Sequence, residues 1–122
     1  MARGGGGSFV ALSSDAGRFA APGQSLIAAT RAAAMAFCRN VALEASRDNI
    51  RVNCVSASYV EDTAIFSDMV ARGSGRPEAS RRRAGLGLPH AADIANIALF
   101  LIGAGSTHLT GQVISVNGGL NA

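Results

Sequence analysis

Three short apolar runs alternate with two longer helical stretches along this chain, and the pattern predicts an α/β fold. The runs at residues 8–13, 50–55 and 112–116 are short and contain β-branched or aromatic residues, which is typical of buried strands. Residues 24–46 are rich in alanine and have apolar residues at three- and four-residue steps, which predicts one long helix. Its apolar stripe consists of Leu26, Ala29, Ala33, Phe37, Val41 and Ala45.

The second half of the chain is less regular until a final helix and strand. Between residues 56 and 90 we expect a short helix near 63–72 and a polar helix after Pro77. A further helix opens at His90–Asp93 and continues to about Ile102. The order strand–helix–strand–helix–strand predicts a parallel three-stranded sheet with flanking helices and right-handed crossovers.

The length of 122 residues is that of a single domain. We assign residues 1–7 to a glycine-rich lead and residues 8–122 to one α/β domain. The composition, 48% hydrophobic and only 16% charged, is apolar for a small protein, which indicates that a partner covers part of the surface.

Basic charge in this chain comes only from arginine, because none of its residues is lysine. The net charge is +3, aromatic residues make up 5%, and the only dense basic run is Arg81–Arg83. This pattern predicts a solvated or interfacial run and no nucleic-acid binding. We find neither a secretory signal nor an 18-residue apolar run, and therefore expect a cytoplasmic chain without a membrane segment.

The cysteine and histidine positions predict no metal site and no disulfide. Cys38 and Cys54 lack CxxC spacing and fall within the predicted helix and strand, so we expect two buried thiols. His90 is expected at a helix entry and His108 on the surface, neither with a ligand partner at metal spacing.

Several motifs follow one another in a family-specific order. Ser13–Gly17 (SSDAG) follows the first strand, Ile50–Asn53 (IRVN) opens the second, and Thr110–Gly119 (TGQVISVNGG) closes the chain. The ordered set, over residues 7–122, resembles the C-terminal half of the short-chain dehydrogenase/reductase (SDR) family. The resemblance implies a partial Rossmann-like fold that lacks the N-terminal dinucleotide-binding half, and an inert subunit, a pseudoenzyme.

The resemblance also assigns catalytic positions to three residues. In this family a serine polarises the substrate carbonyl, a tyrosine thirteen residues later transfers the proton, and a lysine four residues further on lowers the tyrosine pKa. Here Ser14 falls on the serine position, Ile27 on the tyrosine position and Arg31 on the lysine position. Ile27 has no proton to give and Arg31 has nothing there to activate, so Ser14 is the only retained catalytic-position residue.

Other interpretations of the candidate residues remain open. Ser14 can be a turn residue at the end of a strand. Arg31 can belong to a helix-surface salt bridge or bind an anion such as a CoA phosphate. Tyr59, the only tyrosine, is an alternative proton donor in the loop after the second strand.

No residue of this chain is assigned to a cofactor. Gly4–Gly7 precedes the first strand, whereas a dinucleotide loop follows a strand and opens a helix. Ala57 and Ser58 replace the Pro-Gly of the family, and Asp62, next to Thr63, falls on the position of a cofactor-contacting threonine. We expect that this chain alone binds no cofactor and that a complete partner subunit holds NAD(P).

Two functions of different classes remain open. In the first, the chain is a non-catalytic subunit that supports assembly of a heteromeric NAD(P)-dependent dehydrogenase, with a hydroxyacyl-CoA as one candidate substrate. Its partner would be a full-length SDR paralogue in a hetero-oligomer, a tetramer, joined through helix 24–46 and the 93–116 region. In the alternative, the chain is a fragment of an SDR oxidoreductase acting on an alcohol or ketone, and Met1 is an internal residue.

Overall fold

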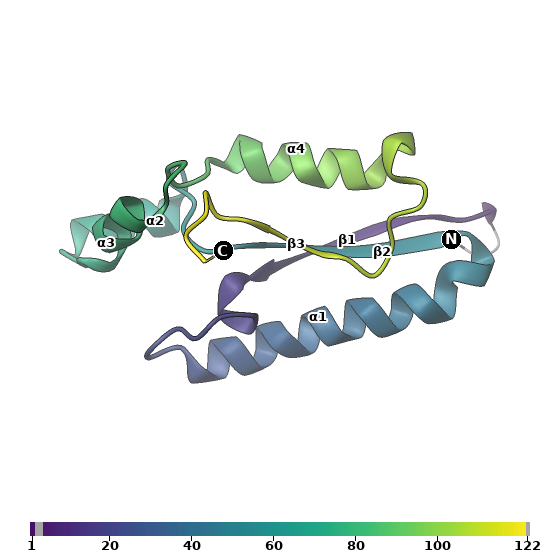
Figure 1. Cartoon of the computed structure of the whole chain (residues 1–122), viewed down its shortest axis with the longest axis horizontal. Coiled ribbons are helices and arrows are strands. Elements are labelled where there is room, and N and C mark those ends of the chain that lie inside the picture. Colours follow the sequence, from purple (N-terminus) through teal and green to yellow (C-terminus); the bar gives the residue numbers. More distant parts are fainter. Residues whose placement is uncertain (2–3, 122) are drawn as a thin grey trace.

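The computed structural model describes residues 1 and 4–121, and shows a three-stranded parallel sheet between helices (Figure 1). The strands are β1 (Gly7–Ser14), β2 (Ile50–Ala57) and β3 (Val113–Val116), in the order β1-β2-β3. Both pairings are parallel, so β2 lies at the centre. The predicted fold class is confirmed.

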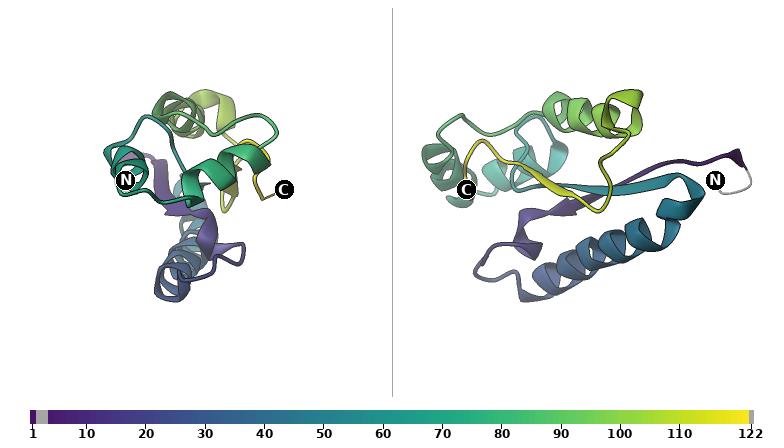
Figure 2. Two further views of the ribbon diagram at one scale, coloured as in Figure 1. Left: turned by 90° about the vertical axis from the view of Figure 1, so that its left-hand side faces the viewer. Right: turned by 45° about the vertical axis from the view of Figure 1, so that its right-hand side comes forward.

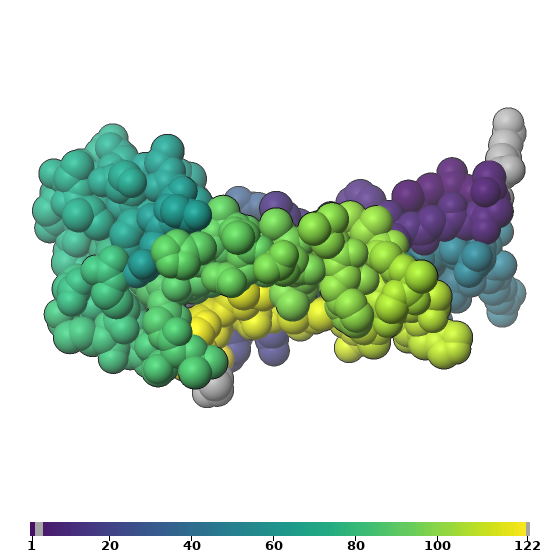
Figure 3. Space-filling model, turned by 90° about the horizontal axis from the view of Figure 1, so that it is seen from above, coloured from purple at the N-terminus to yellow at the C-terminus, as the bar shows by residue number. Residues whose placement is uncertain are grey.

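Four helices surround this sheet. Helix α1 (Ser25–Ala45) lies along one face and α4 (Ala91–Ile102) along the other (Figure 1). Helices α2 (Ala64–Ala71) and α3 (Arg76–Arg83) lie beyond the carboxyl ends of the strands, at the end that faces the viewer in the left view of Figure 2. Seen from above, α4 lies over the sheet and the α2–α3 pair forms one end of the molecule (Figure 3).

The helices agree with the predicted segments to within one or two residues at most ends. Within residues 4–121 the structure adds short 3-10 turns that the sequence pattern did not predict. They are η2 (Asp15–Gly17), η3 (Ser46–Asp48) and η4 (Ala104–Ser106). Residues 2 and 3 of the predicted glycine-rich lead lie outside the described residues, and Gly7, its last residue, belongs to β1.

The prediction that the crossovers are right-handed is wrong for one of them. Both connections step in the same direction, from β1 to β2 and from β2 to β3, yet α1 and α4 cover opposite faces (Figures 1 and 2). Two such parallel connections have opposite hands. The physical reason is burial, because a parallel sheet needs cover on both faces and α1 already occupies one of them.

The main core lies between α1 and the central strand. Met35, Cys38 and Ala42 of α1 pack against Val52 and Cys54 of β2, and all five side chains are buried. This confirms the prediction that both cysteines are buried and free.

The apolar stripe predicted from the periodicity of α1 faces mostly outward. Leu26 is 85% exposed and Phe37 is 60% exposed, whereas the helix contacts the sheet through Met35, Cys38 and Ala42. Because alanine flanks both faces, the apolar spacing does not distinguish the side that meets the sheet.

Helix α1 also corrects the expectation that no segment suits a membrane span. The 24 residues from Ser25 to Asp48 form a helical stretch whose mean hydropathy reaches 1.3, so by length and composition alone it could cross a membrane. One such helix is weak support for a membrane span, and in this fold it packs along a sheet.

The IRVN motif holds the end of α4 and the start of β3 against β2. The Arg51 guanidinium donates hydrogen bonds to the carbonyl oxygens of Leu101 (2.8 Å), Ile102 (3.2 Å) and Gly103 (3.2 Å), which the end of a helix leaves unpaired. Asn53 donates to the Leu109 carbonyl at 2.8 Å. Residues 50 to 56 positions apart in the sequence therefore form one hydrogen-bonded unit.

Candidate functional site

The carboxyl ends of β1 and β2, together with α3 and the residues before α1, enclose a cavity of about 340 Å³. Parallel sheets commonly bind ligands at this edge, because the loops that follow the strands converge there. Among the residues considered from the sequence, Ser14 and Tyr59 both line the cavity, whereas Ile27 and Arg31 do not. The lining consists of Ser14, Asp15, Ala16, Phe19, Ala20, Ala21, Pro22, Gln24, Ser58, Tyr59, Arg76, Ala79, Ser80, Arg83, Leu120 and Asn121.

Ser14 is the last residue of β1 and also caps the turn that follows. Its hydroxyl oxygen accepts a hydrogen bond from the Ala16 amide at 3.3 Å, which is the capping role expected of a serine before a helical turn. The side chain is half-buried and borders the cavity. The turn role of Ser14 is thus present in the structure, and its catalytic role remains a prediction.

Ile27 and Arg31 lie one turn apart near the start of α1, and both side chains are exposed. Gly17 packs directly on this part of the helix, since a Cβ on Gly17 would lie only 2.7 Å from the Ala32 nitrogen. The glycine of the SSDAG motif therefore lets the Ser14 turn approach α1 closely. Isoleucine at position 27 offers no acidic proton at this junction.

A buried carboxylate that the sequence analysis missed lies directly after Ser14. Asp15 is 1% exposed, and its Oδ1 accepts hydrogen bonds from the hydroxyls of Ser56 (2.7 Å) and Ser115. Its Oδ2 accepts from the Asn117 amide at 2.6 Å. A signal did exist, because Ser56 and Ser115 are register partners and Asp15 follows the neighbouring strand, so all three meet at one sheet edge.

Two arginines of the cavity were also missed. Arg76 and Arg83, at the two ends of α3, both line it. The sequence treated Arg81–Arg83 as one solvated or interfacial run. Only the fold shows that Arg83 lines the cavity while Arg81 and Arg82 do not.

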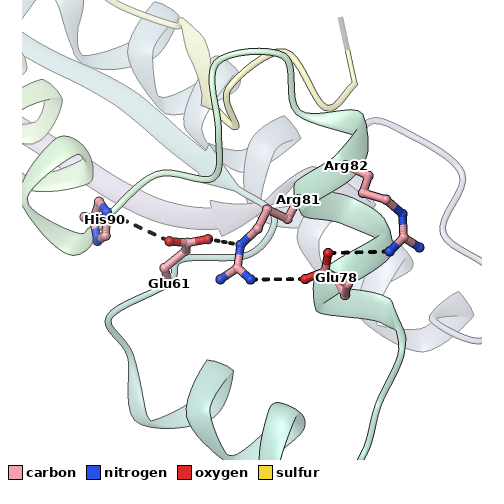
Figure 4. Close-up of polar contacts among 5 residues, drawn as sticks. All are labelled: Glu61, Glu78, Arg81, Arg82 and His90. Atoms are coloured by element: carbon pink, nitrogen blue, oxygen red, sulfur yellow. Dashed lines mark hydrogen bonds and ion pairs between the residues drawn. The ribbon is translucent and has the colours of Figure 1, made fainter.

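The remaining arginines of α3 form ion pairs on the surface (Figure 4). Arg81 contacts Glu61 at 2.7 Å and Glu78 at 3.1 Å, and Arg82 contacts Glu78 at 3.5 Å. The hydrogen bond and charge of Glu61 raise the pKa of Arg81 above its usual value. These two arginines therefore already have acidic partners.

Two residues considered for cofactor contact serve as helix caps. Asp62 Oδ1 accepts a hydrogen bond from the Ala91 amide at 2.7 Å, at the start of α4. The Thr63 hydroxyl oxygen accepts from the Phe66 amide at 3.3 Å, at the start of α2. Neither residue lines the cavity.

The histidines lie where the sequence predicted. His90 is the N-cap of α4, with its ring 4.0 Å from Glu61 and 3.9 Å from Asp62, and His108 is exposed. Within residues 1 and 4–121, no group of three or more His, Cys, Asp or Glu side chains is arranged to hold a metal ion.

Comparison with known proteins identifies relatives along almost the whole chain. The model of a family described as enoyl-(acyl carrier protein) reductase matches residues 1–121. A 3-oxoacyl-(acyl-carrier-protein) reductase FabG of Chlamydia trachomatis is 34% identical over 116 residues, which cover 93% of this chain and 45% of that protein. A tropinone reductase homolog of Arabidopsis thaliana is 35% identical over 114 residues, covering 93% of this chain and 42% of the relative.

Solved structures agree with this assignment. A short-chain type dehydrogenase/reductase from Mycobacterium ulcerans superposes with a TM-score of 0.87 at 28% identity, over 98% of this chain and 43% of that structure. A 7α-hydroxysteroid dehydrogenase complexed with NADH and a 7-oxo bile acid gives a TM-score of 0.89 at 28% identity, over 98% and 46%. The chain thus spans less than half the length of the relatives that it matches. From the family match and these similarities in sequence and fold, the chain belongs to the short-chain dehydrogenase/reductase family.

Proposed function

We propose that this chain is a non-catalytic SDR subunit that supports assembly of a heteromeric NAD(P)-dependent dehydrogenase. The observation that carries the proposal is the exposed apolar surface of α1, on the side away from the sheet. Leu26, Phe37 and Leu43 are all largely exposed there, with Leu43 at 78%. Large exposed apolar patches are uncommon on monomers and mark sites of association.

Helix α4 offers a second surface of the same kind. Leu99, Phe100 and Ile102 are exposed on it, although the helix covers the sheet with its other side. Two apolar surfaces on opposite sides of one chain suit an assembly of more than two subunits. We propose a hetero-tetramer with a full-length SDR paralogue, in which α1 and the 93–116 region form the contacts.

The chemistry of the site supports a non-catalytic role. Ile27 has no group that can transfer a proton, and no lysine exists in the 122 residues to activate a phenol. Arg31 keeps its positive charge, but its side chain is exposed on α1 and does not line the cavity. In the proposed assembly the reaction takes place in the partner subunit, which holds NAD(P) and acts on a substrate such as a hydroxyacyl-CoA. We expect this assembly in the cytoplasm.

Sedimentation tests the assembly role directly. The full chain is sedimented alone and mixed with a complete SDR paralogue from the same cell, at micromolar concentration. The proposal expects a mixed complex of fixed stoichiometry. A well-folded monomer that forms no complex with the paralogue would overturn the proposal.

A second candidate is an SDR oxidoreductase that acts on an alcohol or ketone. It is favoured by one observation, that Ser14 and Tyr59 line the same cavity. Oxidation of NAD(P)H by the purified chain, lost in Tyr59→Phe, would favour this candidate over the assembly role.

A further inference from the structure

The cavity beside Ser14 carries positive charge without acidic partners. Within the described residues, neither Arg76 nor Arg83 forms an ion pair, whereas Arg81 and Arg82 of the same helix are paired with Glu61 and Glu78. Arg76 and Arg83 are seven positions apart, which places both on one side of a helix. Both side chains are exposed to solvent where they line the cavity, and the other two arginines of α3, Arg81 and Arg82, are the ones held in ion pairs (Figure 4).

The only acidic group in the lining does not neutralise these arginines. Asp15 is buried, and both its oxygens already accept hydrogen bonds from Ser56, Ser115 and Asn117. Its contacts all come from the strand side, and no arginine is among them. The cationic side of the cavity is therefore available to a ligand.

Other polar groups of the lining are also available for a ligand. Ser58, Tyr59 and Ser80 line the cavity, and within the described residues their hydroxyls make no hydrogen bond. Apolar side chains, among them Phe19 and Leu120, also line the cavity. A volume of about 340 Å³ is in the range of small-molecule sites.

We propose that this cavity binds a small organic anion, a carboxylate or phosphate ester with a short apolar body. Arg76 and Arg83 bind the anionic head group, because a guanidinium presents paired donors that match both kinds of oxyanion. Phe19 and Leu120 contact the apolar body, and the free hydroxyls complete the polar contacts. This site goes beyond the assembly role and does not depend on it.

Calorimetry on the full chain, in the assembly that it forms, tests the site with defined probes. Hexanoate and hexyl phosphate carry the two candidate head groups, and hexanamide is a neutral control of the same length. We expect one or both anions to bind and hexanamide to bind more weakly. Because hydrogen bonds to charged groups are among the stronger ones, Arg76→Gln with Arg83→Gln should weaken anion binding by about tenfold or more.

Arg82→Gln is the matched control, since it removes the same charge from the same helix at a residue already paired with Glu78. It should leave anion affinity within about twofold, because exposed ion pairs contribute little. Should the double variant lose its circular dichroism signal, each single variant is measured, and each should weaken the anions but not hexanamide. Equal binding of hexanoate and hexanamide, no binding of either anion, or an equal loss in Arg82→Gln would each overturn the site. Because the readout is binding, a negative result leaves the sedimentation test of assembly unaffected.

Discussion

At the scale of single residues, one buried carboxylate joins the carboxyl ends of all three strands. Asp15 follows β1 and accepts hydrogen bonds from Ser56 on β2, Ser115 on β3 and Asn117 just beyond it. A polar group is costly to bury unless it is hydrogen-bonded, and three donors bond this carboxyl. The same turn carries Ser14, so the stability of this cluster also fixes the position of the cavity wall.

Replacing Asp15 with alanine should destabilise the chain strongly. The substitution removes the shared acceptor of Ser56, Ser115 and Asn117 from a buried position, and we expect a loss of about 3 kcal/mol in the free energy of unfolding. Urea unfolding at fixed protein concentration measures this. Asp68→Ala, which removes an exposed pair with Arg72, should change stability by less than about 1 kcal/mol. Similar losses in the two variants would contradict the role of the cluster.

The buried thiols should show a distinctive pH dependence. Burial raises the pKa of Cys54 from 9.0 to about 11, and burial also raises that of Cys38. The folded state therefore favours the neutral thiol. Its contribution to stability is complete below about pH 9 and is lost as pH rises through 11.

Two measurements check this behaviour. A thiol reagent at pH 8 should label neither cysteine in the native chain and both in urea, because the thiolate is the reactive form. The decline in stability between pH 9 and 11 should be smaller in Cys54→Ala than in the natural sequence. Rapid native labelling would show that the core opens more easily than its packing indicates.

At the scale of elements, the sequence predicts the limits of α1 well but not which of its faces meets the sheet. Its limits follow from an alanine-rich stretch between Pro22-Gly23 and Asp48-Asn49, so the helix was predicted to within one residue. Which side meets the sheet was not predictable, because small apolar residues occupy both faces and only the position of β2 decides between them. The same limit applies to Arg76 and Arg83, whose cavity exists only after α3 has packed beyond the strands.

Two substitutions on α1 should distinguish its exposed face, which we propose contacts another subunit, from the face that packs against the core. Phe37 is exposed, so Phe37→Asp should weaken association while leaving the helix signal in circular dichroism nearly unchanged. Val41 packs against the core cluster, so Val41→Asp should cost several kcal/mol and unfold the chain, on the order expected for an unpaired buried charge. Sedimentation and circular dichroism together measure both effects. If Phe37→Asp sediments as the natural chain does, the outer face of α1 is not a contact.

At the scale of the whole molecule, the exposed apolar residues lie on both outer layers. Phe9 and Leu12 of the edge strand β1 add to those of α1 and α4. A sheet edge with exposed apolar side chains pairs readily with another chain or segment. We therefore expect the folded state to depend on protein concentration.

The purified chain should bind no dinucleotide with measurable affinity. Asp62, which falls on the cofactor-contacting position, and the neighbouring Thr63 serve instead as helix caps. The cations that line the cavity, Arg76 and Arg83, both belong to α3. Titration calorimetry with NADH and NADPH measures this, and the 1:1 mixture with a complete paralogue serves as the positive control. Tight binding of either nucleotide by the chain alone would contradict the prediction.

The contacts of Arg51 have a consequence for the order in which the chain folds. Its guanidinium on β2 holds the last turn of α4, fifty residues later in the sequence, and also the Ser106 hydroxyl at 2.9 Å. The pairing of β1 with β2 joins Gly7 to Ile50, a connection of similar length, so loop-closure entropy hardly separates the two steps and the order of synthesis does. The β1–α1–β2 unit can therefore form first on a nascent chain, while α4 and β3 dock only after residues 91–116 have been synthesised.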